Sequence, residues 1–135
     1  MNNFLKKSSL SVLVVIGIGI CINQVTAREI RGYDITIPRF GNITTGRATK
    51  EGYTNGVHNN SAIGGNKRIN TSIQHANTGN DITPSYSMGS GDRIELAYYN
   101  GADAYVGNAT TLSVATPVTT YVKVQAQGSW SPDAQ

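Results

Sequence analysis

Cysteine and histidine are scarce in this chain of 135 residues, which limits the chemistry available to it. The single cysteine, Cys21, lies in an apolar run near the N-terminus, so no intramolecular disulfide can form and stability must come from packing, assembly or a bound ligand. The two histidines, His58 and His75, lie outside any His-Glu-x-x-His arrangement, and the sequence has no Gly-x-Ser-x-Gly elbow. These absences argue against a zincin-type metal site and an esterase-like serine nucleophile. Each histidine is expected to lie in a solvated loop or turn.

Acidic residues are also few, with eight in the whole chain. Glycoside hydrolysis needs two carboxyl groups that face one another across the sugar. The closest pair in sequence, Asp92 and Glu95, would point to opposite faces of a strand. Asp92 is expected to cap the turn at Gly89–Gly91, and the spacing of an EF-hand calcium loop is missing. We therefore predict a protein that is not an enzyme and that needs no cofactor or metal.

The N-terminal segment has the three-part layout of a secretory signal peptide. Lys6 and Lys7 give a basic start, Leu10–Ile22 is apolar, and Val25–Ala27 offers small residues for cleavage. The apolar run is shorter than the roughly 20 residues that span a bilayer. We predict a signal peptide at residues 1–27 and one secreted domain at residues 28–135, extracellular or associated with the cell wall. An uncleaved membrane anchor is the alternative, and Ile20 before Cys21 does not favour a lipoprotein.

Charge is nearly balanced once the predicted signal peptide is removed. The whole chain has 11 basic and 8 acidic residues, and loss of Lys6 and Lys7 leaves nine basic against eight acidic. Binding of nucleic acid needs a clustered basic surface, and the nearest approach to one is the pair Lys67-Arg68. The sequence therefore predicts no nucleic-acid partner.

Large aliphatic residues are sparse, yet extended structure is favoured. From Arg28 onward only 18 of 108 residues are Ile, Val, Leu or Phe, but seven Tyr, one Trp and thirteen Thr add apolar area and β propensity. Period-2 alternation, which indicates strands with one buried face, occurs at Tyr33–Ile37, Arg68–Gln74, Arg93–Tyr99 and Tyr121–Trp130. With turn signals every 10 to 15 residues, this predicts an all-β domain, a single small antiparallel β-sandwich or barrel of about six to eight short strands.

Two segments need separate predictions. Asn100-Gly101 is typical of a type I′ turn and predicts a β-hairpin that joins Ile94–Tyr99 to Ala102–Val106. Thr44–Asn66 is rich in Gly, Asn and Thr, and is expected either to be a long surface excursion or to hold a weak edge strand.

Aromatic residues offer the best candidates for a binding surface. If Tyr98 packs inward on a strand, Tyr99 faces outward and lies close to Tyr105 across the predicted hairpin, where the two rings could stack on a sugar or anchor a protein. The alternative is a cross-strand pair that only stabilises the hairpin. Trp130 continues the buried parity of the last strand, which favours a core position over a surface anchor.

The layout as a whole resembles small Sec-exported β-rich proteins of Gram-positive bacteria that have no assigned function. The features that carry the resemblance are the signal from Lys6-Lys7 to Ala27, the body rich in Asn, Gly and Thr, and the late segment Gly128–Asp133. Secreted bacteriocins of the lactococcin type are similar in size class and in having a leader. The resemblance contains no diagnostic motif, so it transfers no site residue.

Three functions follow as expectations. The first is a secreted, non-enzymatic protein that binds an envelope glycan or a partner protein through Tyr99 and Tyr105, with Trp130 as a weaker candidate. The second is a bacteriocin-like antimicrobial factor, and the third is a self-assembling extracellular matrix component whose strand edges pair. An enzyme would require one of the two histidines to lie beside a carboxylate in a pocket.

Overall fold

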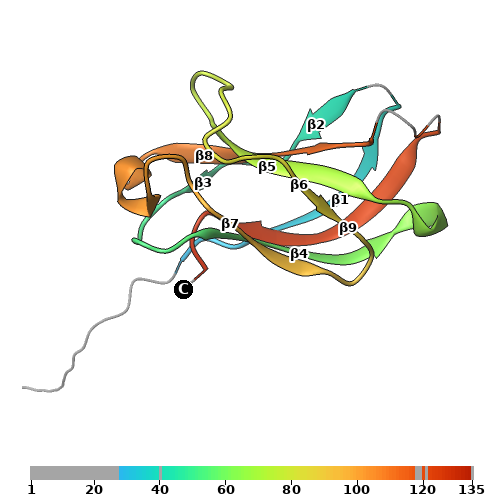
Figure 1. Ribbon diagram of the computed structural model, residues 1–135, viewed down its shortest axis with the longest axis horizontal. Helices are drawn as coiled ribbons and strands as arrows, with labels where there is room; N and C mark the ends of the chain where they lie inside the picture. Colours follow the sequence, from blue (N-terminus) through green and yellow to red (C-terminus); the bar gives the residue numbers. More distant parts are fainter. Residues whose placement is uncertain (1–27, 40, 118–119, 121, 135) are drawn as a thin grey trace, which may run out of the picture.

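The computed structural model describes residues 28–39, 41–117, 120 and 122–134, which form a two-layer antiparallel β-sandwich (Figure 1). The predicted signal peptide at residues 1–27 and Tyr121 lie outside the described residues. The predicted fold class is confirmed, with nine strands where six to eight were expected. No helix in the described ranges is long and apolar enough to cross a membrane.

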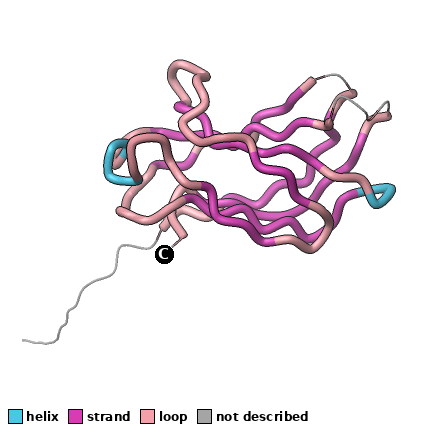
Figure 2. Tube along the Cα trace, viewed as in Figure 1, coloured by secondary structure: helices cyan, strands magenta, loops and turns pink. Residues whose placement is uncertain are grey.

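Four strands make the first layer, which we call the β4 sheet, and five make the second, the β8 sheet. The order in the β4 sheet is β1 (Arg31–Ile37), β9 (Val124–Ser131), β4 (Gly56–Ile63) and β7 (Arg93–Leu96). The order in the β8 sheet is β2 (Asn42–Thr44), β8 (Ala109–Ala115), β5 (Ile69–His75) and β6 (Tyr86–Met88), and β3 (Ala48–Thr49) also pairs with β8. Two short 3-10 turns, η1 (Gly64–Asn66) and η2 (Ala102–Tyr105), lie at opposite ends of the molecule (Figure 2).

The core lies between the two sheets and is built by alternate residues of nearly every strand. Its fully buried large side chains come from β1, β5, β6, β7, β8 and β9. They include Ile37, Ile69, Ile73, Met88, Leu96, Leu112, Val114 and Trp130. The few large aliphatic residues of the sequence are therefore gathered between the two sheets.

Thr44–Asn66 is not a surface excursion; it holds a short edge strand, which was one of the two expectations, and also a central strand that was not expected. The segment contains β3 and then β4, which is flanked by β9 on one side and β7 on the other. The period-2 pattern is obscured because two inward positions of β4, His58 and Asn60, are polar. A β-bulge between Asn60 and Ala62 then shifts the parity of the rest of the strand.

The predicted hairpin at Asn100-Gly101 is half right. A tight turn is present one residue earlier than predicted, because Gly101 N–H donates to the Tyr98 carbonyl oxygen at 3.2 Å and the central residues are therefore Tyr99 and Asn100. Asn100 and Gly101 both have positive φ, 64° and 89°, but the ψ of 158° at Gly101 does not fit a type I′ turn. The strands that the turn was expected to join do not form as predicted, because β7 ends at Leu96 and the residues after the turn form η2. The smaller prediction at Asp92 is confirmed, since its Oδ2 accepts a hydrogen bond of 2.7 Å from Gly89 N–H.

A buried ion pair fastens the C-terminal segment to the loop after β3. Lys50 Nζ lies 2.7 Å from Asp133 Oδ1, and both side chains are at most 1% exposed. The ammonium also donates to the carbonyl oxygens of Gly52, Thr54 and Pro132, while the carboxylate accepts from the backbone N–H groups of Glu51 and Gly52. The Lys50 ammonium and the Asp133 carboxylate thus each have several hydrogen-bond partners, which is the condition under which a buried ion pair is tolerated. In a chain with no disulfide, this pair links segments 83 residues apart.

Candidate functional site

The outer face of the β4 sheet carries a row of small and polar side chains contributed by four strands. Gly32 of β1 pairs with Ser129 of β9, Ser129 pairs with Asn59 of β4, and Asn59 pairs with Arg93 of β7. All four point away from the core because the alternate positions of these strands point into it. Residues 32, 59, 93 and 129 therefore form one line across the sheet, although they are far apart in sequence.

A hollow of about 470 Å³, open to solvent, lies over this row, and we call it the central hollow. Its floor is low because Gly32 has no side chain and Ser129 has a short one. A methyl group added at Gly32 would meet nothing closer than a carbonyl oxygen at 3.8 Å. Other polar residues also line the hollow, namely Asp34, Asn59, Ser61 and Gln127, and we call these its rim.

Hydrogen bonds within the sheet position some of this rim and leave other groups available. Gln127 Nε2 donates to Asp34 Oδ2 at 3.4 Å, across the β1–β9 pair, and Ser61 Oγ donates to the Gln127 carbonyl oxygen at 3.0 Å. Ser61 is the extra residue of the β4 bulge, so the irregularity of that strand places a hydroxyl at the rim. The exposed amide of Asn59 makes no hydrogen bond to another described residue, which leaves its donor and acceptor free for a ligand.

Further hollows extend the central one along β9 in both directions. One of about 260 Å³, the arginine hollow, shares Asn59 and Ser129 with it and is flanked by Arg28 and Arg93. Another of about 190 Å³ shares Gln127 and is lined by Gln125. Together these three hollows form an outer trough whose polar groups are mainly amides and hydroxyls.

The inner face of the same strands holds a polar cluster that belongs to the core. Tyr33 OH lies 2.5 Å from His58 Nε2, and Asn60 Nδ2 donates to the same hydroxyl at 2.9 Å. His58 Nδ1 lies 3.0 Å from Thr71 Oγ1 in the opposite sheet. In the tautomer with the proton on Nδ1, the Tyr33 hydroxyl donates to Nε2 while its oxygen accepts from Asn60, and Nδ1–H donates to Thr71; the other tautomer gives the Tyr33 proton no acceptor among these groups. The cluster therefore joins the two sheets through a neutral imidazole.

Burial sets the ionisation of this cluster. It lowers the pKa of His58 to about 4, and it raises the pKa of Tyr33 to about 12 against the smaller opposing effect of the Asn60 hydrogen bond. Both groups are thus neutral over the physiological range. Neither contact of the His58 ring is with a carboxylate, so the arrangement lacks the orienting acid of a catalytic dyad.

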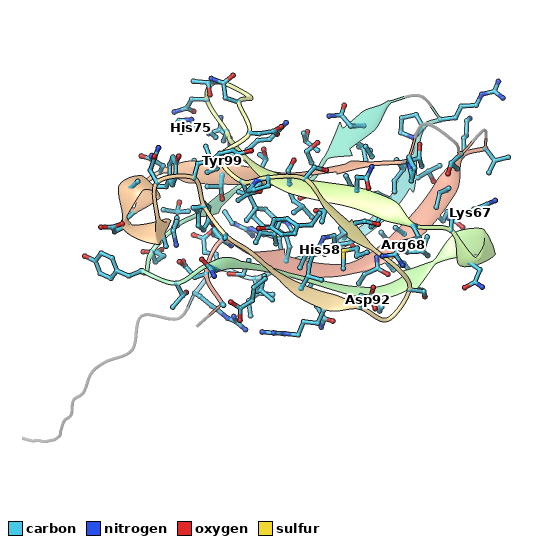
Figure 3. The ribbon with its side chains drawn as sticks, in the orientation of Figure 1. His58, Lys67, Arg68, His75, Asp92 and Tyr99 are labelled. Carbon is cyan, nitrogen blue, oxygen red and sulfur yellow. The ribbon has the colours of Figure 1, made fainter. Side chains whose placement is uncertain are left out.

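The sequence-based expectation for His58 is therefore wrong. His58 is fully buried, and Figure 3 places it between the two layers. His75 lies at the end of β5, where its Nδ1 accepts a hydrogen bond of 3.3 Å from Asn77 N–H, as expected for a turn residue. Within the described ranges no group of three or more His, Cys, Asp or Glu side chains could hold a metal ion.

The three aromatic candidates are not brought together. Tyr99 is 48% exposed, but Tyr105 is half-buried, and its ring packs on the buried Tyr98 with the centroids 5.6 Å apart. The hairpin that would have set Tyr99 opposite Tyr105 is absent. Trp130 is 1% exposed, so the core alternative is confirmed and its ring offers no surface anchor. A role for Tyr99 in binding stays a prediction.

Sequence reasoning missed the outer trough entirely. Its residues are common polar types, and only the strand pairing shows that they adjoin. The alternation of Tyr33, Ile35 and Ile37 does identify Gly32 and Asp34 as outward residues. The alternation does not show which strand pairs with β1, so it does not identify the neighbours of Gly32 and Asp34.

Comparison of the chain with protein-family models, with curated proteins and with solved structures gives no match.

Proposed function

We propose that this protein is a secreted, non-enzymatic binding module whose outer trough holds a glycan of the cell envelope. The observation that carries the proposal is the central hollow of about 470 Å³ on a regular sheet face, rimmed by Asn59, Ser61 and Gln127. A sugar chain presents hydroxyl and acetamido groups along an extended path. Amide and hydroxyl side chains can both donate to such groups and accept from them.

The position of the trough supports a rigid site. Its floor and rim belong to β1, β9 and β4, which pair over seven residues on one side of β9 and six on the other. The backbone of paired strands is held by the sheet ladder and needs little ordering when a ligand binds, which favours recognition of a neutral polymer. Export is supported by the basic, apolar and small-residue order of residues 1–27.

Cosedimentation with isolated cell walls tests this proposal. Purified protein is expected to be retained in a saturable manner, and the Gly32→Val variant is expected to remain in the supernatant because the new side chain fills the floor. Gly46→Val is the matched control, since Gly46 lies in an exposed loop where an added Cβ meets nothing within 4 Å. Equal retention of the wild-type protein and Gly32→Val would place the binding surface elsewhere, and Tyr99→Ala would then be the next variant.

A self-assembling matrix component is the second candidate, because β1 is an edge strand of seven residues with an unbroken register to β9. Such an edge can pair with that of another molecule. Arg31 and Asp34 on β1 oppose this, since charged side chains on an edge discourage pairing. Light scattering at high concentration distinguishes the two: assembly favours the matrix role, and a monomer removes it.

A further inference from the structure

The arginine hollow differs in charge from the rest of the outer trough. Arg93 is exposed and makes no ion pair with a described acid. The Arg28 guanidinium donates to the backbone carbonyl oxygen of Asp133 at 3.0 Å, which is a neutral acceptor, and Arg28 forms no ion pair with a described acid. The Asp133 carboxylate itself is engaged by Lys50. Two positive charges therefore flank one hollow of about 260 Å³.

Acidic side chains also lie on this face, and Glu95 shares the outward face of β7 with Arg93 and pairs with Val57, which lines the hollow. Glu95, on the same strand as Arg93, has its Oε1 3.4 Å from Asn55 Nδ2, from which it accepts a hydrogen bond. Asp34 lies at the rim of the central hollow, where it accepts from Gln127. The trough thus runs from a cationic end at Arg28 and Arg93 to an acidic side chain in its middle.

The hollow also has an apolar side and neutral hydrogen-bonding groups. Ile30 is 54% exposed at its edge, and Val57 adds to the apolar lining. Asn59 and Ser129, shared with the central hollow, supply an amide and a hydroxyl. A ligand that satisfies all of these groups carries a negative charge, hydroxyl or amide groups, and a hydrocarbon surface.

We infer that the arginine hollow binds a sugar residue that bears a carboxylate, at one end of a glycan that continues through the central hollow. This inference rests on the proposed function and names the class of its ligand. A guanidinium is planar and presents paired N–H donors, which match the two oxygens of a carboxylate. The hydrocarbon face of the ring would lie against Ile30, and its hydroxyl or acetamido groups would meet Asn59 and Ser129.

Calorimetric titration of purified protein with defined oligosaccharides of equal length tests the inference. The acidic probe alternates glucuronate with N-acetylglucosamine, the neutral probe contains N-acetylglucosamine alone, and a sulfated galactan oligosaccharide carries negative charge without carboxylate. We expect the acidic probe to bind at least about tenfold more tightly than the neutral one, because hydrogen bonds to charged groups are the stronger kind. Arg93→Gln is expected to remove that difference.

Arg47→Gln is the matched control, since Arg47 is exposed and its guanidinium has only a long contact of 3.4 Å with Asn77. Equal affinity of wild type and Arg93→Gln for the acidic probe would overturn the inference, as would tighter binding of the sulfated probe. Equal binding of the acidic and neutral probes that is lost in Gly32→Val would overturn it and leave the proposed function standing. Failure of all three probes with the wild-type protein would count against both.

Discussion

Two glycines on neighbouring paired strands show how differently the two faces of the β4 sheet are used. Gly32 points outward, and a Cβ there would have open space, with its nearest contact at 3.8 Å. Gly128 is on the inner side, where a Cβ would clash with the Asn59 carbonyl oxygen and lie 2.8 Å from Tyr33 OH. Gly128 is therefore required for packing, because it lets Tyr33 cross β9 to reach His58 and Asn60 on β4. Gly32 has no such packing role, and its missing side chain instead deepens a surface hollow.

The largest difference between the two faces is expected when one methyl group is added at each glycine. Gly128→Ala is expected to lower the free energy of unfolding by about 3 kcal/mol, because the clash is with backbone atoms that cannot move aside cheaply. Gly32→Ala is expected to leave stability unchanged or slightly higher, since Gly in a strand is entropically unfavourable. Urea unfolding of the two variants measures both values. Similar losses in the two would contradict the assignment of separate roles.

Acid pH should lower the free energy of unfolding through His58, which belongs to the inner face of the β4 sheet. Burial lowers the pKa of His58 to about 4 in the folded protein, whereas an unfolded histidine has a pKa near 6.5. Between these values the unfolded state binds the proton and the folded state does not, so stability falls as pH falls from about 6.5 to 4. The expected loss from this residue is about 2 to 3 kcal/mol.

Unfolding free energies measured between pH 7 and pH 4 check this prediction when wild type and His58→Gln are compared. The variant is expected to lose less stability over the interval, because glutamine does not titrate. Parallel curves would show that carboxylates alone determine the acid response and that His58 does not.

Removal of one hydroxyl tests the cluster with a smaller change. Tyr33→Phe leaves His58 Nε2 and Asn60 Nδ2 without their common partner, at an expected loss of about 1 to 2 kcal/mol. Tyr86→Phe serves as control, because its hydroxyl accepts from Ala97 N–H at 3.2 Å in an exposed setting. Thermal unfolding measures the stability of both variants, and a larger loss in Tyr86→Phe than in Tyr33→Phe would contradict the account.

The outer face should show the smallest effects on stability and the clearest effects on binding. Asn59→Ala and Gln127→Ala are each expected to change the unfolding free energy by less than about 0.5 kcal/mol. Each should weaken retention on cell walls by about fivefold, the value of one hydrogen bond of ~1 kcal/mol. Thr36→Ala is a control on the same outward face of β1, outside the residues that line the trough. A destabilised Asn59→Ala would mean that this amide supports the fold.

Local pattern was enough to predict the sandwich class, with strands at Tyr33–Ile37 and Arg68–Gln74 close to β1 and β5. The last strand begins at Val124, two residues later than the alternation at Val122 indicated, and Val122 is half-exposed. Period-2 alternation failed to predict strands whose inward side chains are polar, as in β4. The strand β8, with Thr110, Leu112 and Val114 inward, also went unpredicted, because one inward position is a threonine and the residues between the inward ones, Thr111 and Ser113, also carry hydroxyl groups.

The candidate site could not be predicted, for a different reason. The outer trough depends on the pairing of β1, β9 and β4, which brings residues 32, 59 and 129 into one row. Period-2 alternation gives the face on which a residue lies but not its neighbours across the sheet. The prediction based on Tyr99 and Tyr105 failed to bring those rings together for the same reason, since it assumed a pairing that the 3-10 turn η2 replaces.

The most direct test of the central claim is an NMR titration of ¹⁵N-labelled protein with solubilised cell-wall glycan. The account predicts that the perturbed amide signals belong to Gly32, Asn59, Gln127 and Ser129, with Tyr99 unaffected. Perturbations confined to Tyr99 and the turn around it, or none anywhere at saturating glycan, would contradict it.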